Sequence, residues 1–126
     1  MITRVELPGL GERRGWAFEE FARRCGDYAI AAVGVVMGAS GGRVAAPAIA
    51  IGGGGAGPMR ASGAERVLAG RVPDEACLAE VAQAVDAEID PVSDLQVSAE
   101  YRRHLIGVLV RRAVQTAWRR ARGELS

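Results

Sequence analysis

The chain has 126 residues, a length that fits one folded domain and is too short for a typical dehydrogenase or a TIM barrel. Sixteen basic and 15 acidic side chains leave a formal net charge of +1, so the composition shows no general footprint of nucleic-acid binding. Hydrophobic residues at 49% and charged residues at 25% are ordinary globular usage and exclude a disordered chain.

The first 24 residues predict a strand, a loop and a short helix. Residues 2–7 alternate apolar and polar side chains, and Pro8-Gly9 then ends the pattern, which predicts a short strand. Residues 11–15 are polar and bounded by glycine, as expected of a loop. Residues 16–24 predict one or two helical turns, although the three aromatic side chains of this segment cannot share one narrow helical face.

Two apolar runs in the middle of the chain predict an antiparallel hairpin. Residues 28–37 and 44–51 are rich in apolar side chains, and the sequence Gly-Ala-Ser-Gly-Gly lies between them. Pro47 has no backbone N–H to donate, so we expect it at a sheet edge or at a bulge.

The second half of the chain predicts three helices and no strand, because apolar side chains recur there at helical spacing between capping residues. The expected helices run from Ser62 or Gly63 to Leu68, closed by Gly70; from Pro73 to Ala87 or Ile89, ended by Asp90-Pro91; and from Ala99 to Arg122, capped by Ser98. The whole chain, residues 1–126, is therefore expected to form one α+β domain. It would contain a helix, a three- to four-stranded antiparallel sheet and three helices packed on one face of that sheet.

Glycines after the second apolar run match the dinucleotide-binding spacing G-x-G-x-x-G at Gly52, Gly54 and Gly57. That motif requires a following helix inside a parallel βαβ unit, whereas Pro58 follows here and no further strand is predicted. We therefore interpret the segment as a flexible connection in which glycine permits positive φ.

Arginines crowd the last predicted helix, but they occur in pairs spread around it, so we expect no nucleic-acid partner. Arg102 differs from the others because it falls in the middle of the apolar stripe. A buried arginine needs a carboxylate, and Asp27, Asp90 and Asp94 are the alternatives.

Three side chains are candidate acid–base groups. His104 is predicted on the side of the last helix opposite the apolar stripe, where it is either a plain surface residue or a proton-transfer group in a pocket. Asp27 and Tyr28 stand at the start of a predicted strand, where the aspartate either orders a turn or takes part in catalysis.

Cys25, Cys77 and His104 lack metal-ligand spacing, so no metal site is expected. The N-terminus has no apolar signal core, and the longest apolar run is far shorter than the ~20 residues that span a bilayer. These features predict a cytoplasmic protein with reduced thiols and no membrane contact.

Several segments in order resemble the C-terminal domain of the flavoprotein (medium) subunit of carbon monoxide dehydrogenase and related molybdenum hydroxylases. The similar segments are residues 15–24, 26–29, 48–53, 58–60, 64–65, 93–94 and 98–105. The resemblance implies the α+β arrangement predicted above. It also places Arg24, Gly26, Asp27, Tyr28, Gly52, Gly53, Tyr101, Arg102, Arg103 and His104 on positions of the family pattern.

The FAD-binding glycine motifs of that family lie mainly in a larger preceding domain, which this sequence lacks. The resemblance therefore implies no cofactor in this chain, with FAD present only through a separate partner domain. It implies an accessory or interaction module that packs on an FAD-domain chain and a molybdopterin subunit.

The alternative is a recruited, cofactor-independent enzyme or binder of a small molecule, of isomerase, cyclase or dehydratase type. An apolar face left uncovered without the FAD domain would then serve in self-association or as a pocket. Asp27, Tyr28 and His104 would be the acid–base groups of this homo-oligomer. Arg24, Arg102 and Tyr101 would bind the substrate, with arginine holding an anionic group.

Overall fold

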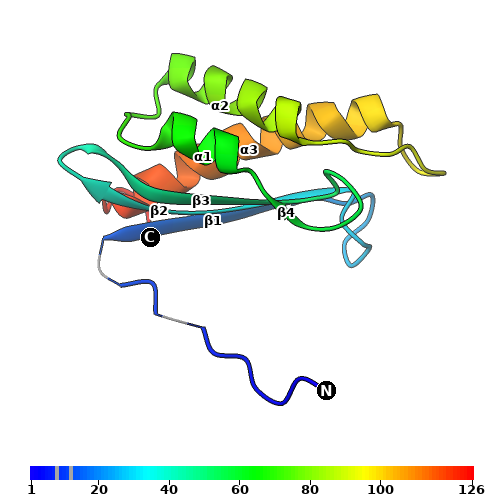
Figure 1. Ribbon diagram of the computed structural model, residues 1–126, viewed down its shortest axis with the longest axis horizontal. Coiled ribbons are helices and arrows are strands. Elements are labelled where there is room, and N and C mark those ends of the chain that lie inside the picture. The colour runs from blue at the N-terminus through cyan, green and yellow to red at the C-terminus, as the bar shows by residue number, and fades with distance from the viewer. Residues whose placement is uncertain (8, 12) are drawn as a thin grey trace.

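The structure, a computed structural model, describes residues 1–7, 9–11 and 13–126. Four strands form one antiparallel sheet in the order β1-β2-β3-β4, and three helices lie on one face of it (Figure 1). The elements are β1 (Arg14–Phe21), β2 (Ala31–Ser40), β3 (Arg43–Gly52), β4 (Met59–Arg60), α1 (Ser62–Leu68), α2 (Glu75–Glu88) and α3 (Ala99–Ala121). The predicted α+β class and the single layer of helices are confirmed.

The prediction of helical turns over residues 16–24 is wrong, because strand β1 occupies most of this segment. Gly15 and Ala17 are buried beneath α3, whereas Trp16 and Phe18 alternate with them on the other face of the sheet. The large side chains are outside and the small ones inside because α3 lies so close to β1. A Cβ built on Gly15 would stand 1.8 Å from the carbonyl oxygen of Ala117.

The strand predicted over residues 2–7 is also absent. Its apolar side chains, Ile2, Val5 and Leu7, are exposed, and no strand pairs with the segment. An alternating pattern cannot form a strand without a partner that accepts its backbone hydrogen bonds. Pro8, the expected stop, lies outside the described residues, as does Glu12 within the predicted loop.

The hairpin of β2 and β3 is confirmed, with a turn of only two residues. Ser40 pairs with Arg43, and the two glycines between them have φ values of 56° and 72°, which favour glycine. The register between the strands shifts after Val36, which marks a β-bulge at Pro47. A bulge is one of the two locations expected for this proline.

The three helices agree closely with their expected bounds. The Oγ atom of Ser98 accepts a hydrogen bond from the Tyr101 N–H at 3.1 Å and caps α3 as predicted. Asp74, rather than Pro73, directly precedes α2 and accepts from the Cys77 N–H at 2.8 Å. Helix α1 starts at Ser62 without a side-chain cap, and its expected end at Gly70 has a φ of 73°.

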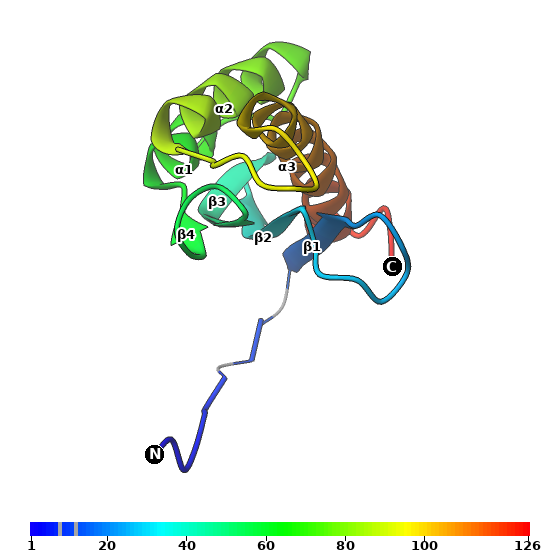
Figure 2. The same ribbon diagram turned by 90° about the vertical axis from the view of Figure 1, so that its right-hand side faces the viewer.

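The core lies between the helices and one face of the sheet, while the described part of the chain places no second layer on the other face (Figure 2). Fully buried side chains from both layers meet there, including Val33, Val35, Ile49, Ile51, Leu78, Val81, Ile106 and Val110. The uncovered face carries Trp16 and Phe18, which are 48% and 59% exposed. A single-layer covering therefore leaves apolar side chains on the outer side of β1.

Candidate functional site

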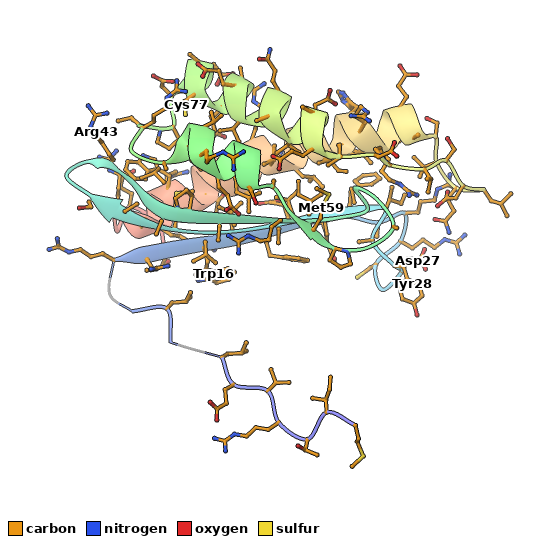
Figure 3. The ribbon with its side chains drawn as sticks, in the orientation of Figure 1. Trp16, Asp27, Tyr28, Arg43, Met59 and Cys77 are labelled. Carbon is orange, nitrogen blue, oxygen red and sulfur yellow. The ribbon has the colours of Figure 1, made fainter. Side chains whose placement is uncertain are left out.

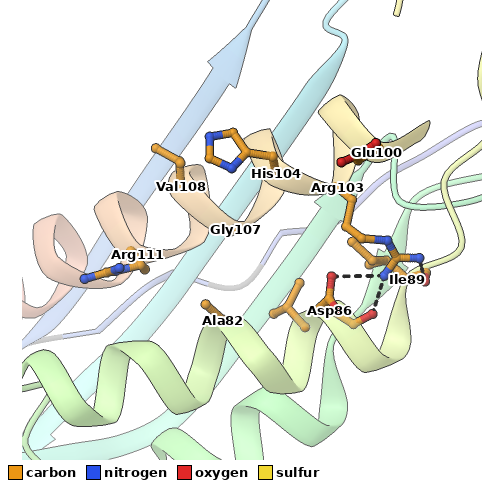
Figure 4. A pocket seen from close by; sticks show the side chains of 10 residues that line it. Ala82, Asp86, Ile89, Glu100, Arg103, His104, Gly107, Val108 and Arg111 are labelled. Atoms are coloured by element: carbon orange, nitrogen blue, oxygen red, sulfur yellow. Dashed lines mark hydrogen bonds and ion pairs between the residues drawn. The ribbon is translucent and has the colours of Figure 1, made fainter. Parts of the chain in front are cut away.

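A groove between α2 and α3 contains the predicted acid–base group His104 (Figure 4). The groove has a volume of about 430 Å³, with an apolar floor and a charged rim. His104 is exposed on the side of α3 away from the sheet, as its helical position predicted. The lining residues are Ala82, Val85, Asp86, Ile89, Glu100, Arg103, His104, Gly107, Val108 and Arg111.

Most charges on the rim of this groove are already paired. Arg103 Nη1 contacts Asp86 Oδ1 at 3.0 Å and Nη2 donates to the Ile89 carbonyl at 3.1 Å, which ties α3 to the end of α2. Arg111 pairs with Glu75. Among the described residues, neither the His104 imidazole nor the Glu100 carboxylate makes a hydrogen bond or ion pair, so both side chains of the groove are uncommitted.

Arg102 pairs with Asp94, one of the three expected alternatives, at 2.6 Å between Nη2 and Oδ2. The Arg102 side chain is only 11% exposed, and a positive charge so largely removed from water needs an ion-pair partner. The Gln96 N–H and the Arg102 guanidinium both bond the Asp94 carboxylate and lower its pKa. Arg102 therefore closes the loop before α3 onto that helix.

Asp27 and Tyr28 lie on the loop between β1 and β2, away from the groove. Tyr28 is 98% exposed, and the Asp27 N–H donates to the Arg24 carbonyl at 3.1 Å within a turn. Figure 3 shows both side chains at the end of the sheet, on the side away from α2. The groove around His104 includes neither of them. Their catalytic roles, and substrate binding by Arg24, Arg102 and the half-exposed Tyr101, stay predictions.

The glycine-rich segment after β3 does not form a dinucleotide cradle. It leads into β4, which pairs antiparallel with β3, and not into a helix that would point its N–H groups at a phosphate. Gly53 has a φ of 82° and passes so close to Ile30 that a Cβ would stand 2.5 Å from its carbonyl oxygen. The Gly54 carbonyl accepts from the Asp90 N–H at 2.8 Å. These glycines therefore serve close backbone packing, and the segment does not fit FAD.

In the part of the chain that the structure describes, no group of three or more His, Cys, Asp or Glu side chains is placed to hold a metal ion. Cys25 is exposed and Cys77 is buried, and burial raises the pKa of the Cys77 thiol. No helix within residues 1–7, 9–11 and 13–126 is long and apolar enough to cross a membrane.

The sequence analysis expected an uncovered apolar face but did not locate it; in the structure it lies on the side of the sheet away from the helices, and we call it the open sheet face. It is defined by Trp16, Phe18, Ala32, Gly34, Val36, Ala48, Ala50 and Pro58. Two shallow hollows of about 330 and 370 Å³ lie on it, one beside each aromatic side chain. The signal was the alternation of small and aromatic residues in β1, which the helical interpretation concealed.

Arg120 of α3 fixes the larger aromatic residue of the open sheet face. Its guanidinium carbon lies 4.4 Å from the centre of the Trp16 ring, and Nη1 donates to the Trp16 carbonyl at 2.9 Å. A stacked cation and a backbone hydrogen bond together limit the rotation of the indole. Trp16 is thus half-exposed but held in place.

Comparison with known proteins gives a consistent result. Residues 16–117 match the family described as the CO dehydrogenase flavoprotein C-terminal domain. The chain is 35% identical to the carbon monoxide dehydrogenase medium chain of Afipia carboxidovorans, over 97% of this chain and 42% of that protein. It is 36% identical to the nicotine 6-hydroxylase medium subunit of Paenarthrobacter nicotinovorans, over 93% of this chain and 41% of that subunit.

Solved structures share the fold. A chain of carbon monoxide dehydrogenase from Hydrogenophaga pseudoflava superposes with a TM-score of 0.87 at 35% identity, covering 90% of this chain and 40% of that one. Quinoline 2-oxidoreductase from Pseudomonas putida 86 gives a TM-score of 0.79 at 32% identity, covering 90% and 39%. The chain spans about two-fifths of the relatives it matches. The resemblance inferred from the sequence is confirmed, and the chain belongs to the CO dehydrogenase flavoprotein C-terminal domain family.

Proposed function

We propose that this chain is a docking module of a molybdenum-hydroxylase flavoprotein, which packs on an FAD-binding partner and does not hold FAD itself. The observation that carries the proposal is the open sheet face, an apolar surface that none of the described segments covers with a second layer. Contiguous apolar surface of this kind marks sites of association. The relatives extend well beyond the matched segment, so each contains further chain that such a face can meet.

The chemistry of the open sheet face suits a close protein contact. Gly34, Ala48 and Ala50 present almost no side chain, which lets a partner approach the sheet backbone. Trp16 and Phe18 project beside them as the aromatic anchors that commonly dominate interface energies. Residues 1–7 also extend away on this side of the sheet (Figure 2).

The assignment of FAD to the partner rests on the glycine-rich segment. Its glycines pack against Ile30 and Ile89, and it opens no helix, so it offers no turn for a pyrophosphate. This geometry supports the assignment of FAD to the partner chain.

The test is co-expression of the chain with an FAD-binding chain and a molybdopterin-binding chain from the same genome. We expect the chain to co-elute with flavin absorbance in size-exclusion chromatography and to be colourless alone. Trp16→Ala combined with Phe18→Ala should abolish co-elution. Leu95→Ala, which truncates an exposed apolar side chain away from the open sheet face, should leave it intact. Stoichiometric FAD on the isolated chain, or co-elution that survives the double substitution, would contradict the proposal.

A second function, a cofactor-free small-molecule enzyme of isomerase, cyclase or dehydratase type, is favoured by one observation. His104 lines a groove of about 430 Å³ with an uncommitted imidazole. In this alternative the chain acts as a homo-oligomer without a flavin partner. Asp27 and Tyr28 lie away from the groove, so they would act there only from a second copy of the chain. Activity that persists after His104→Gln, Asp27→Asn and Tyr28→Phe are combined would eliminate it.

A further inference from the structure

We propose that a pocket at the C-terminal end of α3 binds the phosphate group of a phosphate-bearing small molecule. Four arginine side chains line it, from two parts of the chain more than a hundred residues apart: Arg13, Arg14, Arg120 and Arg122. The volume of the pocket is about 590 Å³. It is separate from the groove around His104, and it borders Trp16 only through Arg120.

The fold produces this cluster through close packing of β1 under α3. Gly15 allows the strand to pass directly beneath the last turns of the helix, which brings Arg13 and Arg14 to the residues that end α3. The hairpin turn supplies the remaining wall with Gly41 and Gly42, around which a Cβ would meet nothing within 4 Å. The pocket is therefore open, because the wall opposite the arginines has no side chains.

The charges in this pocket are poorly compensated by the described residues. Only Arg122 has a carboxylate partner, Glu124, at 2.7 Å. Arg120 is held by its stacking on Trp16 and its bond to the Trp16 carbonyl, and its buried Nε has no hydrogen-bond partner. Arg13 and Arg14 make no ion pair with any acidic side chain that the structure describes.

Helix electrostatics do not explain the cluster. Cations at the end of a helix complement its dipole, which accounts for Arg120 and its neighbours. Arg13 precedes β1 and Arg14 begins it, so neither gains anything comparable. Arg13 also adopts a φ of 57°, a left-handed conformation that costs a non-glycine residue about 1 kcal/mol. An external anion would supply the counter-charge that the described residues lack.

Phosphate is the anion that this arrangement suits. Guanidinium groups donate two parallel hydrogen bonds to phosphate oxygens, and a tetrahedral group with several oxygens can accept from more than one arginine at once. A guanidinium already immobilised on an aromatic ring loses less entropy on binding than a free one. A single compact cluster also differs from the basic stripe that tracks a nucleic-acid backbone.

The test is isothermal titration calorimetry of the full chain with inorganic pyrophosphate, with citrate and sodium chloride added at matched ionic strength. We expect saturable pyrophosphate binding, at least tenfold tighter than citrate, and no heat of binding from chloride. Arg13→Gln combined with Arg14→Gln should weaken pyrophosphate binding at least tenfold while the Arg120–Trp16 stack remains. Arg112→Gln, which removes a charge from an exposed position of α3 outside the pocket, should change it less than twofold.

A second measurement locates the bound group. In Trp118→Phe, Trp16 is the remaining tryptophan, and pyrophosphate at Arg120 should shift its fluorescence with the affinity found by calorimetry. Equal binding of citrate, an unchanged affinity in the Arg13/Arg14 variant, or a response that chloride reproduces would overturn the proposal. None of these results would affect the docking function, which depends on the open sheet face.

Discussion

Replacing Gly15 by alanine tests the contact that organises this fold. A Cβ at this position would stand 1.8 Å from the Ala117 carbonyl oxygen and 2.4 Å from the Ala121 nitrogen, both of which are backbone atoms of α3. Carbon and oxygen atoms normally approach no closer than about 3.3 Å, so the helix must move from β1 by roughly 1.5 Å. Backbone atoms in a hydrogen-bonded helix cannot rotate away as a flexible side chain can.

The expected cost of Gly15→Ala is about 3 kcal/mol, the upper end of the usual range for overpacking, because rigid elements clash on both sides. A shift of that size also opens the contacts of α3 with β1 and β2 and loses much of their dispersion energy. Urea unfolding followed by circular dichroism measures the difference. The matched control is Gly34→Ala on β2, where a Cβ would lie 3.8 Å from the Phe18 ring and should be tolerated. A Gly15→Ala variant whose free energy of unfolding lies within about 1 kcal/mol of the wild-type value would contradict a rigid close contact between β1 and α3.

Three further predictions concern single contacts, each measured by urea unfolding. Glu65 accepts bonds from Arg60 at 2.7 and 2.9 Å, but the Arg60 side chain is 59% exposed, so Glu65→Gln should cost about 1 kcal/mol. The Arg60 guanidinium lowers the pKa of Glu65 below its ordinary 4.5. The ion pair should therefore contribute its full stabilisation above pH 4.5, and this contribution should decline as the pH falls toward the lowered pKa. In Glu65→Gln this pH dependence should be absent. Asp94→Asn should lower the unfolding midpoint by leaving Arg102 unpaired, and adding Arg102→Met should restore part of the loss. Gly107→Ala should stabilise α3 by about 1 kcal/mol, because open space surrounds this position; a lower midpoint would mean that the groove closes on it.

The open sheet face and the arginine pocket share one structural origin. Both depend on β1, which carries Trp16 on one side and delivers Arg13 and Arg14 to the end of α3. Arg120 links the two surfaces by stacking on Trp16. A substitution that displaces β1 should therefore weaken partner docking and pyrophosphate binding together, whereas Phe18→Ala should weaken docking alone.

Features that depend on neighbouring residues in the chain were predictable from the sequence. The hairpin, the cap at Ser98 and the bounds of α3 follow from turn residues, side-chain caps and apolar spacing, all of which act within a few residues. The side of α3 on which His104 lies follows from helical geometry in the same way. The family resemblance likewise rests on motifs that can be read in order along the chain.

The tertiary structure alone decided the features in which distant segments meet. The sequence offered three aspartates as possible partners of Arg102, and the fold of the loop before α3 selects Asp94. The helical prediction for residues 16–24 failed because the proximity of α3, and not local propensity, places Gly15 inside and Trp16 outside. The arginine pocket joins residues 13–14 to residues 120–122. A sequence pattern records which side chains are apolar or charged, but packing between layers determines which of them are buried, paired or left exposed to a partner.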